Sequence, residues 1–141
     1  LYYDRFGKPH LHDVKHISIT HSHEFSALII SDETVGIDIE LQREKILRIA
    51  DKFTNSEFLY LEPEKLQDYI RKLTVIWGAK EAIFKIRNEK GISFKNHIKI
   101  NTFELEQEQT TAELHFDSLI KDFKIYFEEL ENFTLVYALE K

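Results

Sequence analysis

Residues 35–40 read Val-Gly-Ile-Asp-Ile-Glu, and this stretch has the alternation of a short β-strand. Successive side chains of a strand point to opposite faces, so Asp38 and Glu40 share one face, about 7 Å apart along the backbone. The isoleucines beside Asp38 share the other face. Two carboxylates on one strand face are suited to a hard divalent cation. An edge strand with two solvated acids would show the same pattern, so the stretch alone leaves both interpretations open.

A long helix is predicted over residues 63–88, because apolar residues recur there at helical spacing. They are Leu66, Tyr69, Ile70, Leu73, Ile76, Trp77 and Phe84. Within this helix Trp77, Glu81 and Lys85 are four residues apart and therefore share one side. Taken alone, that spacing is explained by a tryptophan in the core and a favourable surface ion pair between Glu81 and Lys85.

The remaining segments favour β-structure and short helices. Residues 16–20, 25–31 and 35–40 are predicted to form an antiparallel meander, residues 43–53 a helix, and residues 54–57 a capping box that opens another. Further strands are predicted at 92–94, 97–105 (with a bulge near Asn101), 112–116, 123–127 and 133–139. Strands in hairpin order with one long helix predict an α+β fold, in which an antiparallel sheet has the long helix packed across it.

Composition narrows the function classes. The 141 residues suffice for one domain, so residues 1–141 are taken as a single unit. The charge of −6, from 19 basic and 25 acidic residues, argues against sequence-independent nucleic-acid binding. The sequence has no apolar run long enough to cross a bilayer. Cysteine is absent, which excludes disulfides and thiolate metal ligands. We expect a cytoplasmic protein that does not bind membranes.

The strand and the helix together are far more specific than either alone. The pair Gly36-Ile37-Asp38-Ile39-Glu40 and Trp77-Gly78-Ala79-Lys80-Glu81-Ala82-Ile83-Phe84-Lys85 resembles the pattern of the 4′-phosphopantetheinyl transferases, in particular the larger two-lobed type. Upstream, Gly7-Lys8-Pro9 resembles the family's Gly-Lys-Pro loop. Ser18-Ile19-Thr20-His21-Ser22 resembles its Ser-Ile-Ser-His-Ser turn, with Thr20 in place of serine. Downstream, Gly91-Ile92-Ser93-Phe94 is similar to the loop that follows the family helix.

The resemblance implies transfer of the 4′-phosphopantetheine arm from coenzyme A, the substrate, to a serine of an acyl or peptidyl carrier protein. Such phosphoryl chemistry needs charge neutralisation and in-line positioning. Asp38, Glu40 and Glu81 would then hold Mg²⁺, with Mn²⁺ as an alternative. Glu81 would act as the base, directly or through a metal-bound water, and Lys85 would stabilise charge on the pyrophosphate.

The resemblance also implies a set of residues that bind coenzyme A. His21 would contact a phosphate, with Thr20 beside it, Lys8 would lie near the nucleotide, and Lys80 would assist Lys85. Trp77 is expected to be structural.

In the two-lobed family the complete enzyme is a pseudo-dimer with coenzyme A between its lobes. The chain has no methionine and begins at Leu1, so we expect it to be the second lobe of a longer enzyme or to self-associate through the face that would meet a first lobe. Its isolated activity is then expected to be low.

The sequence is also compatible with two other interpretations. His10, His12, His21 and His23 could bind zinc, although paired His-x-His motifs on loops are a weak indication. Alternatively, the chain could be a non-catalytic lobe that binds a carrier protein or coenzyme A within a larger assembly.

Overall fold

The computed structural model describes residues 2–10, 15–22 and 25–141. Its strands are β1 (Tyr2–Tyr3), β2 (Pro9–His10), β3 (His16–Ser22), β4 (Phe25–Ser31), β5 (Val35–Leu41), β6 (Ile98–Ile100), β7 (Gln109–Phe116), β8 (Leu119–Leu130) and β9 (Phe133–Glu140). Its α-helices are α1 (Ile46–Phe53), α2 (Leu66–Ile86) and α3 (Phe94–His97). Two 3₁₀ helices, η1 (Ser56–Tyr60) and η2 (Leu105–Gln107), complete the described elements.

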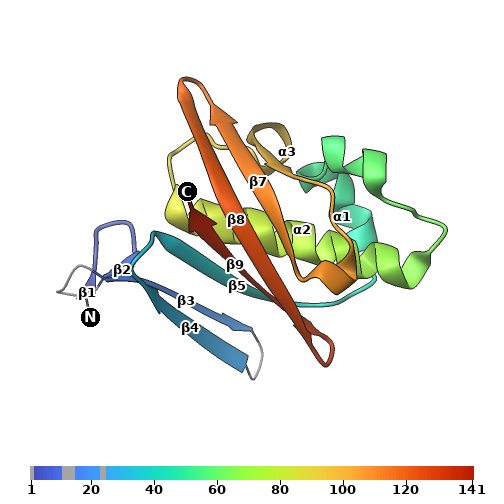
Figure 1. The fold of residues 1–141 in the computed structure, drawn as a ribbon, viewed down its shortest axis with the longest axis horizontal. Coiled ribbons are helices and arrows are strands. Elements are labelled where there is room, and N and C mark those ends of the chain that lie inside the picture. Colours follow the sequence, from blue (N-terminus) through green and yellow to red (C-terminus); the bar gives the residue numbers. More distant parts are fainter. Residues whose placement is uncertain (1, 11–14, 23–24) are drawn as a thin grey trace.

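The largest element is a five-stranded antiparallel sheet in the order β5-β9-β8-β7-β6. Helix α2 crosses one face of this sheet and lies behind it in Figure 1. Along β8, Phe123, Ile125 and Phe127 alternate with more exposed residues and are buried in the core. The predicted α+β fold, with a long helix packed across an antiparallel sheet, is confirmed.

The predicted three-strand meander is only partly right. Strands β3 and β4 form an antiparallel hairpin of their own, but β5 joins the five-stranded sheet instead of pairing with β4. Its partner is β9, almost one hundred residues further along the chain, with Asp38 opposite Val136 and Glu40 opposite Thr134. The strand that carries the candidate metal ligands, β5, is therefore held in the sheet by the last strand, β9.

Local predictions were less accurate after residue 53. The expected capping box is wrong: the Thr54 hydroxyl is buried without a partner, and the Glu57 carboxylate instead accepts from the amide of Asn55 at 3.0 Å. The expected strand at 92–94 gives way to a turn that leads into α3. The expected bulge near Asn101 is also wrong, because β6 ends at Ile100 and η2 follows.

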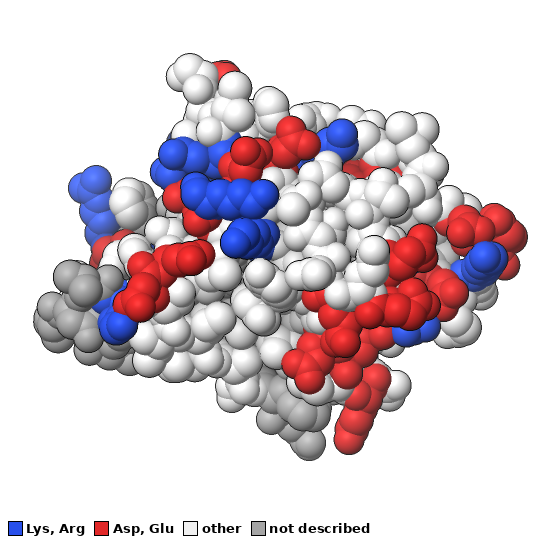
Figure 2. Space-filling view, viewed as in Figure 1, with Lys and Arg blue, Asp and Glu red and all other residues white. Residues whose placement is uncertain are grey.

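Surface charge is unevenly distributed over the face shown in Figure 2. Acidic side chains gather near the β8–β9 hairpin, whereas Lys and Arg side chains lie over the opposite part of β8. Acidic side chains therefore dominate near the β8–β9 hairpin, whereas basic and acidic side chains are mixed around the opposite part of β8. Among the described residues, no helix is both long and apolar enough to cross a membrane.

Candidate active site

The site is built on the face of β5 that meets α2. Gly36 allows this contact, because a Cβ at that position would lie 2.0 Å from the carbonyl oxygen of Ala82. Two residues further along, Asp38 is 6% exposed. A Cβ built on Gly78 of α2 would lie 3.7 Å from Asp38 Oδ2. The closeness of strand and helix therefore places the Asp38 carboxylate in the interface between them.

Asp38 is a buried acid, and only one of its two carboxylate oxygens has a partner. Its Oδ1 is 3.4 Å from Lys85 Nζ, while its Oδ2 is buried and has no hydrogen-bond partner. Burial raises the pKa of Asp38, and the neighbouring carboxylate of Glu40 raises it further, although the charge of Lys85 acts in the opposite direction. An oxygen left without a donor in such a position is suited to a cation.

Glu40 on β5 and Glu81 on α2 are the other two candidate ligands. Glu40 accepts a hydrogen bond from Trp77 Nε1 at 3.0 Å, so Trp77 is more than a core anchor. Burial raises the pKa of Glu81, the negative charge of Glu40 adds to this effect, and Lys85 opposes it.

The carboxylates are not already gathered into a metal cage. Among the described residues, no group of three or more His, Asp or Glu side chains is close enough to hold a metal ion directly. Mg²⁺ commonly keeps several waters and uses only one or two protein carboxylates together with substrate phosphates. The unpartnered oxygen of Asp38, with Glu40 next to it, fits that requirement.

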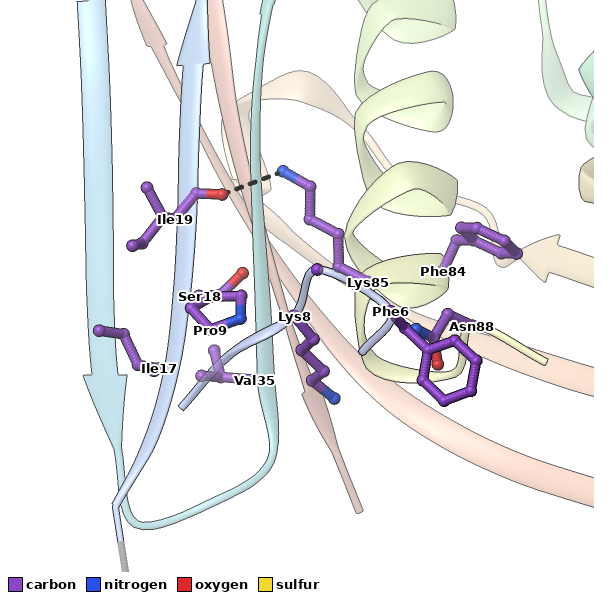
Figure 3. Close-up of a pocket in the computed structure, with 11 residues that line it drawn as sticks. Phe6, Lys8, Pro9, Ile17, Ser18, Ile19, Val35, Phe84, Lys85 and Asn88 are labelled. Carbon is purple, nitrogen blue, oxygen red and sulfur yellow. Dashed lines mark hydrogen bonds between the residues drawn. The ribbon is translucent and has the colours of Figure 1, made fainter. Parts of the chain in front are cut away.

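A pocket of about 250 Å³ adjoins this site. It lies between the Gly-Lys-Pro loop, β3, the start of β5 and the end of α2 (Figure 3), and both Lys8 and Lys85 line it. Lys8 Nζ donates to the carbonyl of Ile86 at 3.3 Å. Lys85 extends from α2 towards β3 and donates to the carbonyls of Ile37 at 2.6 Å and Ile19 at 3.5 Å. Two lysines at one pocket are suited to phosphate groups.

The Gly-Lys-Pro loop is held by Asp4. The carboxylate of Asp4 accepts from the amides of Phe6 at 2.9 Å and Lys8 at 3.0 Å, and it also pairs with His10 at 2.9 Å. Gly7 has a φ of 81°, which favours glycine. Sequence reasoning missed Asp4, although Asp and Asn commonly bond to backbone amides close to them in the sequence.

Strand β3 carries two of the predicted coenzyme A residues on opposite faces. His21 is exposed, as a phosphate ligand needs to be. Thr20 is 5% exposed, and its hydroxyl accepts from the amide of Ile39 at 3.2 Å. Ser18, two residues earlier, makes the same contact with Ile37 at 3.0 Å. This placement does not agree with the prediction that Thr20 contacts coenzyme A.

Lys80 does not belong to the site. Its side chain is fully buried, where Nζ lies 3.0 Å from Glu57 Oε2 and donates to the carbonyls of Phe53 at 2.6 Å and Phe94 at 2.9 Å. All three ammonium protons therefore have protein partners, so the predicted coenzyme A contact of Lys80 does not fit the structure. The burial of Lys80 could have been predicted from helical spacing, because Lys80 follows the buried Ile76 by four residues and shares its side of the helix.

The described part of the structure does not support the alternative of a zinc site formed by the N-terminal histidines. Nε2 of His10 is 2.9 Å from the carboxylate of Asp4, and its ring stacks on Tyr2 with 5.2 Å between ring centroids. His12 and His23 lie outside the described residues.

The fold and the site define an α+β domain in which buried acids adjoin a lysine-lined pocket. The family model of the 4'-phosphopantetheinyl transferase superfamily matches residues 34–138, which include the five-stranded sheet up to Ala138, and α2. The chain therefore belongs to the 4'-phosphopantetheinyl transferase superfamily, as the sequence motifs indicated. It is also 30% identical over 128 residues to the 4'-phosphopantetheinyl transferase gsp of Aneurinibacillus migulanus. The match covers 90% of this chain and 52% of that protein, so the chain spans about half the length of this relative.

Proposed function

We propose that this chain takes part in transferring the 4′-phosphopantetheine arm from coenzyme A to a serine of an acyl or peptidyl carrier protein, with Mg²⁺ or its substitute Mn²⁺. The observation that carries the proposal is the buried, unpartnered Oδ2 of Asp38, in a site adjoining a pocket lined by Lys8 and Lys85. A metal site next to a phosphate site is what phosphoryl transfer at a pyrophosphate requires.

The proposal gives the carboxylates and the lysines different roles. Asp38, Glu40 and Glu81 would hold the metal, directly or through its waters, and the metal would neutralise charge on the pyrophosphate. Lys85 would also face the pyrophosphate, since its ammonium already lies at the border between Asp38 and the pocket. Lys8 would bind the nucleotide end.

His21 would contact a phosphate from the exposed face of β3. Its replacement by alanine should therefore raise KM for coenzyme A more than it lowers kcat, because a phosphate contact remote from the reacting bond acts mainly on binding.

The reaction is balanced without any further reagent. A bond forms between the serine oxygen and the phosphorus that carries the pantetheine arm, and the pyrophosphate bond to the nucleotide phosphate breaks. The serine proton passes to Glu81, directly or through a water. The nucleotide leaves as an anion, which Lys8 and Lys85 are placed to stabilise through their positions at the pocket.

The test is the intact mass of a carrier protein after incubation with this protein, coenzyme A and Mg²⁺. We expect a gain of one phosphopantetheine arm, lost in Asp38→Ala and when a chelator removes the metal. Lys72→Met serves as the control. Lys72 also lies on α2, but it pairs with Glu104 and does not line the pocket.

Failure to modify any carrier would contradict the catalytic proposal. Retained binding of coenzyme A or of the carrier protein in that case would favour the alternative of a binding lobe in a larger assembly.

A further inference from the structure

Strands β3 and β5 are joined by side chains instead of a backbone ladder. β3 is paired with β4 and β5 with β9, so the two strands belong to different sheets. Nevertheless, the Ser18 hydroxyl accepts from the amide of Ile37 at 3.0 Å, and the Thr20 hydroxyl accepts from the amide of Ile39 at 3.2 Å. The two hydroxyls on β3 and the two amides on β5 therefore have the same spacing along their strands, so that each hydroxyl bonds to one amide.

We call the two contacts, Ser18 with Ile37 and Thr20 with Ile39, the β3–β5 joint. The joint lies on both sides of Asp38, the central residue of the candidate site. Ile37 and Ile39 are the neighbours of Asp38 in β5, so the two hydroxyls hold the backbone on both sides of that carboxylate. Ser18 and Thr20 are each 5% exposed, and water therefore has little access to replace them. Loss of either hydroxyl would leave a buried amide without a partner, which is unfavourable because that amide cannot bond to water instead.

The joint also sets the border of the pocket. Lys85 Nζ donates to the carbonyls of Ile37 on β5 and Ile19 on β3, so it bridges the same two strands. Ser18, Ile19 and Lys85 all line the pocket (Figure 3). The contacts made by Ser18 and Thr20 and those made by Lys85 therefore join β3 to β5 at the edge of the pocket.

We propose that Ser18 and Thr20 are positioning residues, which fix β5 against β3 and thereby place Asp38 relative to the pocket lysines. The functional part of this inference rests on the proposed function. Thr20 acts through β5 in this arrangement and does not touch the substrate. Removing residues that orient a metal ligand typically weakens metal affinity about 10–100-fold.

Three variants and one control separate the possibilities. Thr20→Val removes the hydroxyl at nearly constant shape, Thr20→Ser retains it, and Ser18→Ala removes the other hydroxyl. Thr74→Val is the control, because Thr74 is also fully buried but its hydroxyl donates to the carbonyl of Ile70 in its own helix at 2.7 Å.

The first measurement is amide hydrogen exchange by NMR, which needs no activity. Thr20→Val should accelerate exchange at Ile39 about ten-fold, and Ser18→Ala should do the same at Ile37. Thr20→Ser and Thr74→Val should leave both amides protected. Unchanged exchange at Ile39 in Thr20→Val and at Ile37 in Ser18→Ala would overturn the joint itself.

The second measurement is the dissociation constant for Mn²⁺, followed by paramagnetic resonance, together with kcat and KM. Thr20→Val should weaken Mn²⁺ binding about ten-fold and lower kcat, whereas Thr20→Ser should restore both. A higher KM for coenzyme A with unchanged Mn²⁺ affinity would instead show that Thr20 contacts the substrate, and would overturn the positioning role. If the unaltered protein neither binds Mn²⁺ nor transfers the arm, the proposed function fails, and the joint is then decided by amide exchange alone.

Discussion

The indole nitrogen of Trp77 donates a hydrogen bond to Glu40 Oε1 at 3.0 Å. This bond links the two sequence motifs of the family, since Glu40 belongs to β5 and Trp77 to α2. The indole ring also packs against Phe53 and Phe94, with ring centroids 5.1 and 5.4 Å away. Trp77 therefore combines a packing role with the orientation of a candidate metal ligand.

Replacing Trp77 by Phe should separate those two roles. The smaller ring keeps most of the packing but removes the donor, so Glu40 loses a hydrogen bond to a charged group, worth about 1.5–3 kcal/mol. We expect Mn²⁺ affinity to fall by up to about ten-fold. Phe94→Leu is the control, because it changes packing around the indole while leaving the bond to Glu40. Equal Mn²⁺ affinity in Trp77→Phe and the unaltered protein would contradict the proposal that Trp77 orients Glu40 as a metal ligand.

Replacing Gly36 by Ala should disrupt the contact between β5 and α2. The added Cβ would lie 2.0 Å from the backbone oxygen of Ala82, and backbone atoms cannot move aside independently. We expect a loss of about 3 kcal/mol or more in the free energy of unfolding. Gly78→Ala is a matched comparison, since its Cβ would meet the Val136 side chain at 2.7 Å. Urea denaturation should show Gly36→Ala to be clearly the less stable; equal stability would mean that the strand–helix contact is looser than described.

Replacing Lys80 by Met should act on stability and not on substrate binding. The change leaves the Glu57 carboxylate, which is 1% exposed, without its ammonium partner, and breaking a buried ion pair typically costs about 3–5 kcal/mol. Lys72→Met should cost much less, because its partner Glu104 is exposed. Equal stability of the two variants, with a raised KM for coenzyme A only in Lys80→Met, would restore the substrate role for Lys80.

The pair between Arg71 and Glu129 should make stability depend on pH in acid. The hydrogen bond from Arg71 lowers the pKa of Glu129, and the charge of Arg71 and a bond from Gln42 add to this. Because the folded pKa lies below the unfolded one, the pair stabilises the fold above about pH 4.3, the ordinary glutamate value. This stabilisation is lost as pH falls through the lowered pKa.

Comparison of the protein with Glu129→Gln tests this dependence. The difference in free energy of unfolding should be largest near pH 7 and should shrink below about pH 4. The exposed Glu44→Gln should show no such trend. A constant difference across this range would contradict the assignment of the lowered pKa to Glu129.

Much of this protein could be predicted from local sequence patterns. Alternation over 35–40 identified β5 and put Asp38 and Glu40 on one face, and apolar spacing identified α2 to within three residues at its start. These predictions succeed because the period of a strand or helix depends on neighbouring residues alone. The spacing and order of the motifs also indicated the family that the comparisons then showed.

Only the tertiary structure decided which partners those elements have. β5 pairs with β9 and not with the adjacent β4, because strand partners are chosen by burial across the whole sheet. Lys80 and Glu81 are neighbours in sequence, yet a helix turns by about 100° between them, so one faces the core and the other the site. Thr20 similarly turned out to support β5, since sequence gives the face of a strand but not what packs against it.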